Sequence, residues 1–147
     1  MHISLKGLAL IKKYEGFKPE AYYCPAGYLS IGYGHRLDTS QKHSLITMSD
    51  AHKFLVFDLS YAALVIDKYV KVSLKQGQYD ALCSLVYNWG SAGFSKSQGL
   101  KYLNQSNYSQ AAEEFFSRKQ GVVNIKGVFC QGLYNRRQAE LELWNEN

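Results

Sequence analysis

The stretch from residue 14 to residue 36, YEGFKPEAYYCPAGYLSIGYGHR, constrains the fold more than any other part of the chain. It begins at the end of an apolar helical pattern and then alternates strand-forming side chains with Gly and Pro, which favour turns. This order predicts a helix end followed by a tight antiparallel hairpin. An acid, a thiol and a hydroxyl lie within it: Glu15, then Cys24 after eight residues, then Ser30 after five more. We therefore expect one side of a catalytic cleft here.

The pattern of the remaining residues predicts a mainly helical body around this hairpin. Thr47 and Asp50 have the spacing of a capping box at the start of a long amphipathic helix, and Gly90 and Gly93 interrupt the pattern further on. Ser4 is a possible cap of the first helix. The expected helices cover 4–14, 47–69, 75–89, 96–105, 109–118 and 132–145, with a sheet over 17–36, a polar loop at 38–44 and an irregular connection at 118–127. The last helix is expected to turn Leu133, Leu141 and Trp144 inward.

These elements predict an α+β fold in one domain, residues 1–147. A small antiparallel β-lobe, about 16–45, is joined by the long helix to a mainly helical lobe, about 1–15 and 46–147, with the active-site cleft between the lobes. A hydrophobic share of 46% with two prolines is typical of a globular chain, and no stretch approaches the roughly 20 apolar residues of a membrane span. We expect no membrane insertion.

Charge and cysteine content narrow the function classes further. The net charge is +5, but the densest basic clusters are pairs, so we expect no nucleic-acid partner. Cys24, Cys83 and Cys130 are odd in number and widely spaced, which indicates neither a disulfide framework nor a metal site. Cys83 is interpreted as core filling and Cys130 as a loop thiol. No cofactor or metal is expected.

Glu15 suits the chemistry of glycoside cleavage. That reaction needs a general acid to protonate the leaving oxygen and a second group to activate water or stabilise the transition state. Between Tyr14 and Phe17, Glu15 could be partly desolvated, which would raise its pKa and keep it protonated near neutral pH. The alternative is an ordinary carboxylate at a helix end, although a helix C-terminus disfavours negative charge.

The sequence resembles the bacteriophage-type lysozymes, muramidases that include many phage endolysins, over nearly its whole length. The resemblance rests first on Glu15, Cys24 and Ser30 followed by Ile31-Gly32-Tyr33-Gly34-His35. Two further segments match the family in order: QYDALCSLVYNWGSAGFSKS at 78–97 and the arginine-rich GLYNRRQAELELW at 132–144. Three motifs in order, in a chain of matching length, make the likeness specific.

The resemblance implies roles for individual residues. Glu15 would be the general acid, Cys24 would replace the Asp that activates water in many members, and Ser30 would replace the usual Thr that helps to hold that water. On the hairpin side, Gly34 and Arg36 would meet the glycan or its peptide stems.

Four further residues follow from the same likeness. Tyr87 and Asn88 would line the opposite wall and contact substrate. His35 is interpreted as structural, with Asp67 as a possible partner. Arg136 would approach the catalytic Glu, or else be a surface charge of the last helix.

Cys24 leaves its role open. An unperturbed thiol has a pKa of about 8.5, so few molecules would carry a thiolate at neutral pH unless the pKa is lowered. The thiol could position water or act as a weak base in an inverting hydrolysis, serve as a transient nucleophile, or contribute little while Glu15 carries the reaction. A buried structural cysteine is the remaining interpretation.

The leading hypothesis is hydrolysis of the β-1,4 bond between N-acetylmuramic acid and N-acetylglucosamine in peptidoglycan, by a monomer. A lytic transglycosylase forming an anhydro product is one alternative, and a non-catalytic binding module on the lysozyme fold is another. The first sixteen residues hold too short an apolar run for a secretory signal. We therefore expect synthesis in the host cytoplasm and action on the bacterial wall after release or delivery.

Overall fold

The computed structural model describes residues 1–38 and 45–146. It falls into two compact units: a helical unit, Met1–Leu10 with Ala62–Asn147, and a hairpin unit, Ile11–Tyr61. The predicted β-lobe at 16–45 falls inside the hairpin unit. Within the polar loop expected at 38–44, all residues after Asp38 lie outside the described part of the chain. The mixture of helices with small antiparallel sheets confirms the α+β class.

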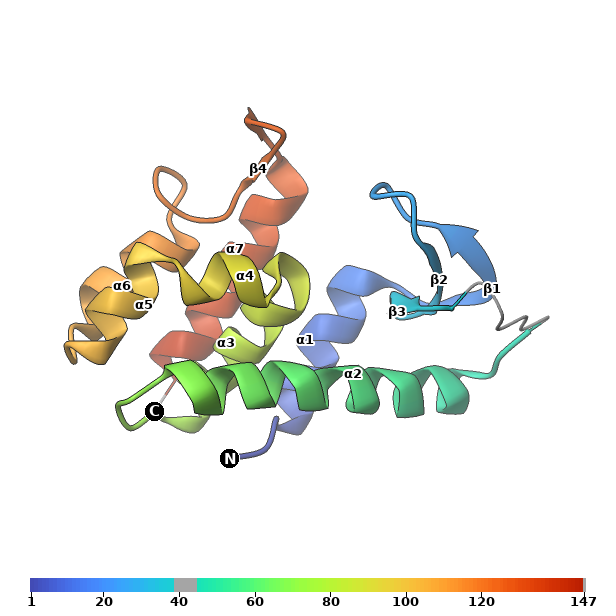
Figure 1. The fold of residues 1–147 in the computed structure, drawn as a ribbon, viewed down its shortest axis with the longest axis horizontal. Coiled ribbons are helices and arrows are strands. Elements are labelled where there is room, and N and C mark those ends of the chain that lie inside the picture. Colours follow the sequence, from blue (N-terminus) through green and yellow to red (C-terminus); the bar gives the residue numbers. More distant parts are fainter. Residues whose placement is uncertain (39–44, 147) are drawn as a thin grey trace. The chain divides into compact units, whose positions relative to one another are not determined.

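The hairpin unit contains a three-stranded sheet in the order β1-β2-β3 (Figure 1). Its elements are the end of α1 (Leu5–Glu15), β1 (Lys18–Tyr23), β2 (Leu29–Gly32), β3 (His35–Arg36) and the first part of α2 (Met48–Tyr69). Both strand pairs are antiparallel, so the hairpin predicted over 17–36 is confirmed.

The pairing of β1 with β2 contains a bulge. Lys18 is opposite Gly32 and Tyr22 is opposite Ser30, so three residues of β1 face one of β2 between these pairs. Pro19, which has no N–H to donate to a ladder, lies in the bulge. Its carbonyl instead accepts a hydrogen bond of 3.0 Å from the N–H of Ile46.

The start of α2 is fixed by the predicted capping box. The Asp50 carboxylate accepts from the Thr47 N–H and the Thr47 hydroxyl oxygen accepts from the Asp50 N–H, each at 3.1 Å. Behind this cap Ala51, Leu55 and Leu59 are buried, as the helical spacing predicts. Gly32, with φ of +68°, lies so close to the helix that a Cβ would be 3.0 Å from the Cβ of Ala51.

In the helical unit α3 packs on α7, and α6 packs on both α5 and α7 (Figure 1). Its elements are α3 (Gln76–Trp89), α4 (Ser91–Ser95), α5 (Gln98–Asn104), α6 (Tyr108–Phe116), β4 (Asn124–Ile125), β5 (Val128–Phe129) and α7 (Gln131–Asn145), besides the ends of α1 and α2. Phe94, Phe115, Phe116 and Trp144 form an aromatic core with ring centroids 5.6–6.4 Å apart.

The N-terminal segment belongs to this helical unit. Ser4 caps α1, because its hydroxyl oxygen accepts from the Gly7 N–H at 3.2 Å, as expected. The N–H of Ser4 donates to the Asp80 carboxylate of α3 at 2.9 Å. Leu5, which shares the helical spacing of the apolar face, is 84% exposed and does not pack inward.

Three features differ from expectation in the second half of the chain. The segment around Gly90 and Gly93, expected to interrupt the helical pattern, contains the short helix α4. The connection expected to be irregular at 118–127 contains β4, which pairs with β5 in a second hairpin. In α7 the prediction for Trp144 is correct, but Leu133 and Leu141 are half-buried. The buried set of that helix is instead Arg136, Arg137, Glu140, Leu143 and Trp144.

None of the described helices is both long enough and apolar enough to cross a membrane.

Candidate active site

Glu15 is the last residue of α1. Gly16 follows with φ of +69°, and its N–H donates to the Lys12 carbonyl at 3.0 Å, which closes the helix with a left-handed residue. The chain therefore turns away directly after Glu15 and leads into β1. The Glu15 side chain is half-buried.

Cys24 occupies the tip of the first hairpin. Its N–H donates to the Tyr28 carbonyl at 2.9 Å, and its own carbonyl accepts from the Gly27 N–H at 2.8 Å. Pro25 presets the backbone at the second position of this turn, and Gly27 supplies the left-handed φ of +85°. The residue is half-buried and its thiol is free of any disulfide.

The turn surrounds the Cys24 thiol with hydrogen-bond donors. The backbone N–H of Tyr28 contributes most to lowering the pKa of the thiol below its ordinary value, and burial opposes this effect. The N–H groups of Ala26 and Gly27 and the Ser30 hydroxyl lower it further. Such donors stabilise a thiolate more than a thiol, so the loop favours the ionised form.

Ser30 lies on β2 and is 4% exposed. Its hydroxyl is 3.4 Å from the Tyr28 carbonyl oxygen and also within hydrogen-bonding reach of the Cys24 thiol. A hydroxyl has one proton, so it can donate to one of these acceptors at a time. The structure thus brings together Cys24 and Ser30, which are six positions apart in sequence.

Tyr22 interacts electrostatically with both Glu15 and Cys24, and sequence reasoning did not single it out. Burial, followed by the negative charges of Glu15 and Cys24, raises the pKa of the Tyr22 phenol. The phenol is therefore within electrostatic range of both groups. The alternation of side chains on a strand, which places residues 22 and 24 on one face, could have indicated it. The ammonium of Lys18 lies 3.9 Å from the centre of its ring.

His35 is structural, as expected, but its partner is Asp58 rather than Asp67. Its Nδ1 is 3.0 and 2.9 Å from the two Asp58 carboxylate oxygens, and its ring stacks on Phe54 at 4.5 Å. Asp67, the possible partner suggested from the sequence, is therefore not the carboxylate that His35 Nδ1 contacts. Burial raises the pKa of Asp58, and the hydrogen bond from His35 acts against that rise.

Gly34 and Arg36 flank His35. Gly34 has φ of +88° in the turn that joins β2 to β3. Arg36 is exposed, and its guanidinium carbon lies 3.3 Å from the centre of the Tyr28 ring. The cation is therefore held at the tip of the Cys24 turn rather than extended into solvent.

The remaining predicted residues belong to the helical unit. Tyr87 is half-buried and Asn88 is exposed, both in the last turn of α3. Arg136 is 3% exposed, with its Nε 3.3 Å from both the Ser84 hydroxyl and a Glu140 carboxylate oxygen. Its interpretation as a surface charge is therefore wrong, and its approach to Glu15 stays a prediction.

The other two cysteines have structural environments. Cys83 is 1% exposed in α3, and burial, as the largest effect, raises its pKa to about 12. This confirms its interpretation as core filling. Cys130 is half-buried at the N-terminal end of α7.

Comparisons with known proteins identify the family of this chain. The family model described as phage lysozyme matches residues 12–140. An endolysin of Acyrthosiphon pisum secondary endosymbiont phage 1 is 44% identical over 144 residues, which is 98% of each chain. The endolysin of Salmonella phage P22 is 39% identical over 119 residues, covering 78% of this chain and 82% of that protein.

A solved structure shows the same fold. The endolysin from Escherichia coli O157:H7 phage FAHEc1 superposes with a TM-score of 0.82 at 33% identity, covering 99% of this chain and 94% of that one. The chain belongs to the phage lysozyme family.

Proposed function

We propose that this chain is an endolysin-type muramidase that cleaves the β-1,4 bond between N-acetylmuramic acid and N-acetylglucosamine in peptidoglycan. Membership of the phage lysozyme family supports glycoside cleavage. The observation that carries the proposal is the hairpin tip, where backbone N–H groups and Ser30 polarise the Cys24 thiol. Tyr22, within electrostatic range of both Cys24 and Glu15, relates the tip to the acid.

In the proposed mechanism Glu15 donates its proton to the glycosidic oxygen as the bond to the anomeric carbon breaks. A water molecule attacks that carbon from the opposite face, so that the configuration inverts. The Cys24 thiolate accepts a proton from the water, and the Ser30 hydroxyl orients it. After cleavage Glu15 is a carboxylate and Cys24 is a thiol. Glu15 then takes up a proton from solvent and Cys24 releases one, which restores the starting state.

The environment of the Cys24 thiol supports a role as a base over a role as a nucleophile or as a residue that contributes little. Donors that lower its pKa increase the fraction of thiolate, which a base requires. Direct attack by the sulfur would give a covalent intermediate and retention of configuration, so the stereochemistry of the product distinguishes the two roles.

We assign substrate contacts to four residues. Gly34 offers backbone groups next to the sheet, and Arg36, held over Tyr28, offers a cation to the carboxylates of the peptide stems. Tyr87 and Asn88 offer an aromatic face and an amide to a sugar with an acetamido group. We assign Arg136 a supporting role, in which a buried guanidinium orients an acid.

A lytic transglycosylase is the second candidate, and the thiol at position 24 is the observation that favours it. In that reaction the hydroxyl of the muramic acid itself attacks and no water has to be activated, so a weak base would suffice. Mass spectrometry of digested sacculi separates the products, because a hydrolase releases reducing muramic ends and a transglycosylase releases anhydromuramic ends.

The deciding experiment compares wild type, Glu15→Gln and Cys24→Ser on purified peptidoglycan. We expect reducing muramic ends from wild type, none from Glu15→Gln and fewer from Cys24→Ser. Anhydromuramic products from wild type would overturn the hydrolase proposal. Full activity of Glu15→Gln would remove that residue from the mechanism, and an inactive wild type would favour a non-catalytic module.

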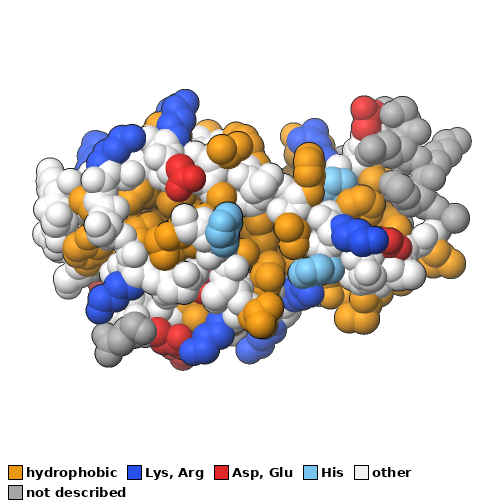
Figure 2. Space-filling model, turned by 90° about the horizontal axis from the view of Figure 1, so that it is seen from below, with side chains coloured by type: hydrophobic (Ala, Val, Ile, Leu, Met, Phe, Trp, Pro, Cys, Tyr) orange, Lys and Arg blue, Asp and Glu red, His pale blue; other side chains and the backbone are white. Residues whose placement is uncertain are grey.

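We propose that the protein acts on the bacterial cell wall, which it reaches after release or delivery from the cytoplasm. We also propose that it acts as a monomer. On the face shown in Figure 2, lysines and arginines are dispersed among hydrophobic and uncharged side chains. This face therefore offers no continuous track of cations of the kind that nucleic acid needs. A gel-shift titration at several salt concentrations tests this point.

A further inference from the structure

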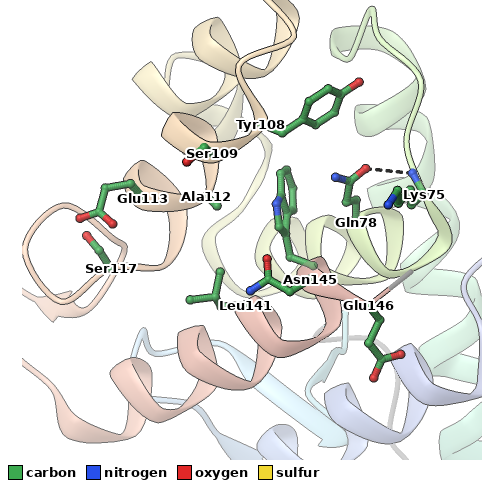
Figure 3. A pocket seen from close by; sticks show the side chains of 11 residues that line it. Lys75, Gln78, Tyr108, Ser109, Ala112, Glu113, Ser117, Leu141, Asn145 and Glu146 are labelled. Atoms are coloured by element: carbon green, nitrogen blue, oxygen red, sulfur yellow. Dashed lines mark hydrogen bonds between the residues drawn. The ribbon is translucent and has the colours of Figure 1, made fainter.

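The helical unit contains a pocket of about 450 Å³ that the proposed mechanism does not use (Figure 3). It lies where the start of α3 meets α6 and the end of α7. Gln78 and Trp144 form buried parts of its wall, Ala112 and Leu141 add apolar surface, and Ser109 and Glu113 are exposed residues at its margin. A volume of this size suits a small ligand.

Gln78 turns a hydrogen-bond donor toward this pocket. The residue is 8% exposed, and its Oε1 accepts from the Lys75 N–H at 2.9 Å. Because a backbone N–H needs an acceptor, this bond fixes the orientation of the amide, and Nε2 must be the opposite end. Figure 3 shows Nε2 directed away from Lys75 into the pocket. Within residues 1–38 and 45–146, this nitrogen has no acceptor.

Trp144 lines the same pocket and carries an indole N–H donor. It is 4% exposed, and its ring packs edge-on to Phe115 and Phe116 with centroids 6.4 and 5.6 Å apart. In the described part of the chain, its indole N–H donates to no side chain or carbonyl. Neither this nitrogen nor Gln78 Nε2 is among the buried atoms without a partner in the described part of the chain, so water or a ligand can reach both donors.

The donors, the apolar surface and the carboxylate together select the class of ligand. An acetamido group offers a carbonyl oxygen to two N–H donors and a methyl group to apolar surface such as Ala112 and Leu141. Sugar hydroxyls can donate to the Glu113 carboxylate and to the Ser109 hydroxyl oxygen. We propose that this pocket binds an N-acetylhexosamine unit of a glycan strand, as a second and non-catalytic subsite.

The choice of a glycan rests on the proposed muramidase function. A subsite in the helical unit that holds a sugar without cleaving it would keep the enzyme on the wall between successive cleavages. Its effect should therefore be large on intact sacculi and small on short soluble fragments.

The test is a titration of the full-length, ¹⁵N-labelled protein with tri-N-acetylchitotriose, followed by NMR. We expect the Trp144 indole and Gln78 side-chain amide resonances to shift in a saturable manner. In Gln78→Glu, a carboxylate oxygen still accepts from the Lys75 N–H but the donor is lost. The affinity reported by Trp144 should fall at least about tenfold. Gln105→Glu makes the same chemical change on an exposed residue and should leave the affinity unchanged.

An unmoved Trp144 resonance at saturating probe, or equal affinity in Gln78→Glu, would show that the pocket holds water alone and would overturn the proposal. Release of reducing ends from soluble peptidoglycan fragments is measured in parallel. Normal release with no response at Trp144 contradicts the subsite alone. Absence of release from wild type contradicts the proposed function, whatever the Trp144 resonance does.

Discussion

Cys24 and Cys83 carry the same side chain in opposite surroundings. At Cys24 the N–H of Tyr28, with other donors of the turn, lowers the pKa of the thiol. At Cys83 burial in α3 raises the pKa to about 12. Since the thiolate is the reactive form, the backbone of a turn and the core of a helix pair give two cysteines of one chain different chemistry.

Alkylation should report this difference directly. A thiol with a pKa of about 12 is ionised in roughly one molecule in ten thousand at pH 8, so Cys83 should not react with iodoacetamide in the folded protein. Cys24 should react first, and Cys83 after unfolding in guanidinium chloride. Peptide mapping by mass spectrometry measures both sites, with Cys24→Ser as control. Equal rates at Cys24 and Cys83 in the folded protein would contradict the assignment.

The role of Cys24 as a base also predicts a dependence on pH. The active form carries a proton on Glu15 and none on residue 24. Cys24→Asp lowers the pKa at residue 24, since an ordinary Asp has a pKa of about 3.9. A larger fraction of the molecules then has a protonated Glu15 together with an unprotonated residue 24. The pH optimum should therefore move to lower pH, and the maximal rate should rise.

Cys24→Ser removes the ionisable group and should lower kcat about 10²-fold, within the usual contribution of a base. Rates of reducing-end release from pH 4 to pH 9 test both variants. An unchanged optimum in Cys24→Asp, with near-normal activity of Cys24→Ser, would mean that Glu15 carries the reaction without a base at this position.

Elements whose ends are marked by short-range chemistry were predictable from the sequence. The capping box of Thr47 and Asp50 located the start of α2, and the apolar spacing behind it located the buried face. The β4–β5 hairpin escaped notice because its turn has Lys126 and Gly127, with φ of +49° and +80°. Asn or Asp usually precedes the Gly of such a turn, so Lys gave no indication of it.

The contacts between residues of different elements were not predictable in the same way. Both Asp58 and Asp67 lie on α2, and helical spacing does not say which of them His35 meets. In α7 the buried face consists largely of Arg136, Arg137 and Glu140, which a hydropathy pattern assigns to solvent. Glu15, Cys24 and Ser30 were predicted because they share one local segment that resembles the family, whereas Tyr22 is identified by its electrostatic interaction with Glu15 and Cys24.

The contact of the hairpin with α2 predicts the effect of a glycine substitution. Gly32→Ala requires a left-handed alanine and brings its Cβ to 3.0 Å from the Ala51 Cβ. Gly16 has a similar φ of +69°, but a Cβ there would meet nothing within 4 Å. Gly16→Ala should therefore lower the free energy of unfolding by about 1–2 kcal/mol, and Gly32→Ala by about 1–3 kcal/mol more. Urea unfolding measures both, and equal losses would contradict a tight packing contact at Gly32.

At the scale of the whole molecule, buried charge is a prominent part of the helical unit. Glu140 and Arg137 are 0% exposed and Arg136 is 3% exposed. The Glu140 carboxylate accepts from the Ser84 hydroxyl at 2.6 Å and from Arg137 at 2.8 Å. The network ties α3 to α7 through charges that have no access to water.

Removing Glu140 should therefore be costly. Glu140→Ala leaves two buried guanidinium groups without their carboxylate and should lower the free energy of unfolding by about 3–5 kcal/mol. Lys6→Ala breaks the exposed pair with Glu146, at 2.7 Å, and should lower it by less than about 1 kcal/mol. If Glu140→Ala does not fold, Glu140→Gln keeps the volume and an acceptor and gives the measurement. A loss from the Glu140 variants no larger than that from Lys6→Ala would contradict the proposed role of the network.

The bond between Ser4 and Asp80 joins residues 76 positions apart. While the chain emerges from the ribosome, Ser4 cannot form this hydrogen bond until Asp80 of α3 has been synthesised. Every residue of the hairpin unit, Ile11–Tyr61, has been made by then. During translation the part that carries Glu15, Cys24 and Ser30 is therefore complete before the N-terminal segment can bind its partner on α3.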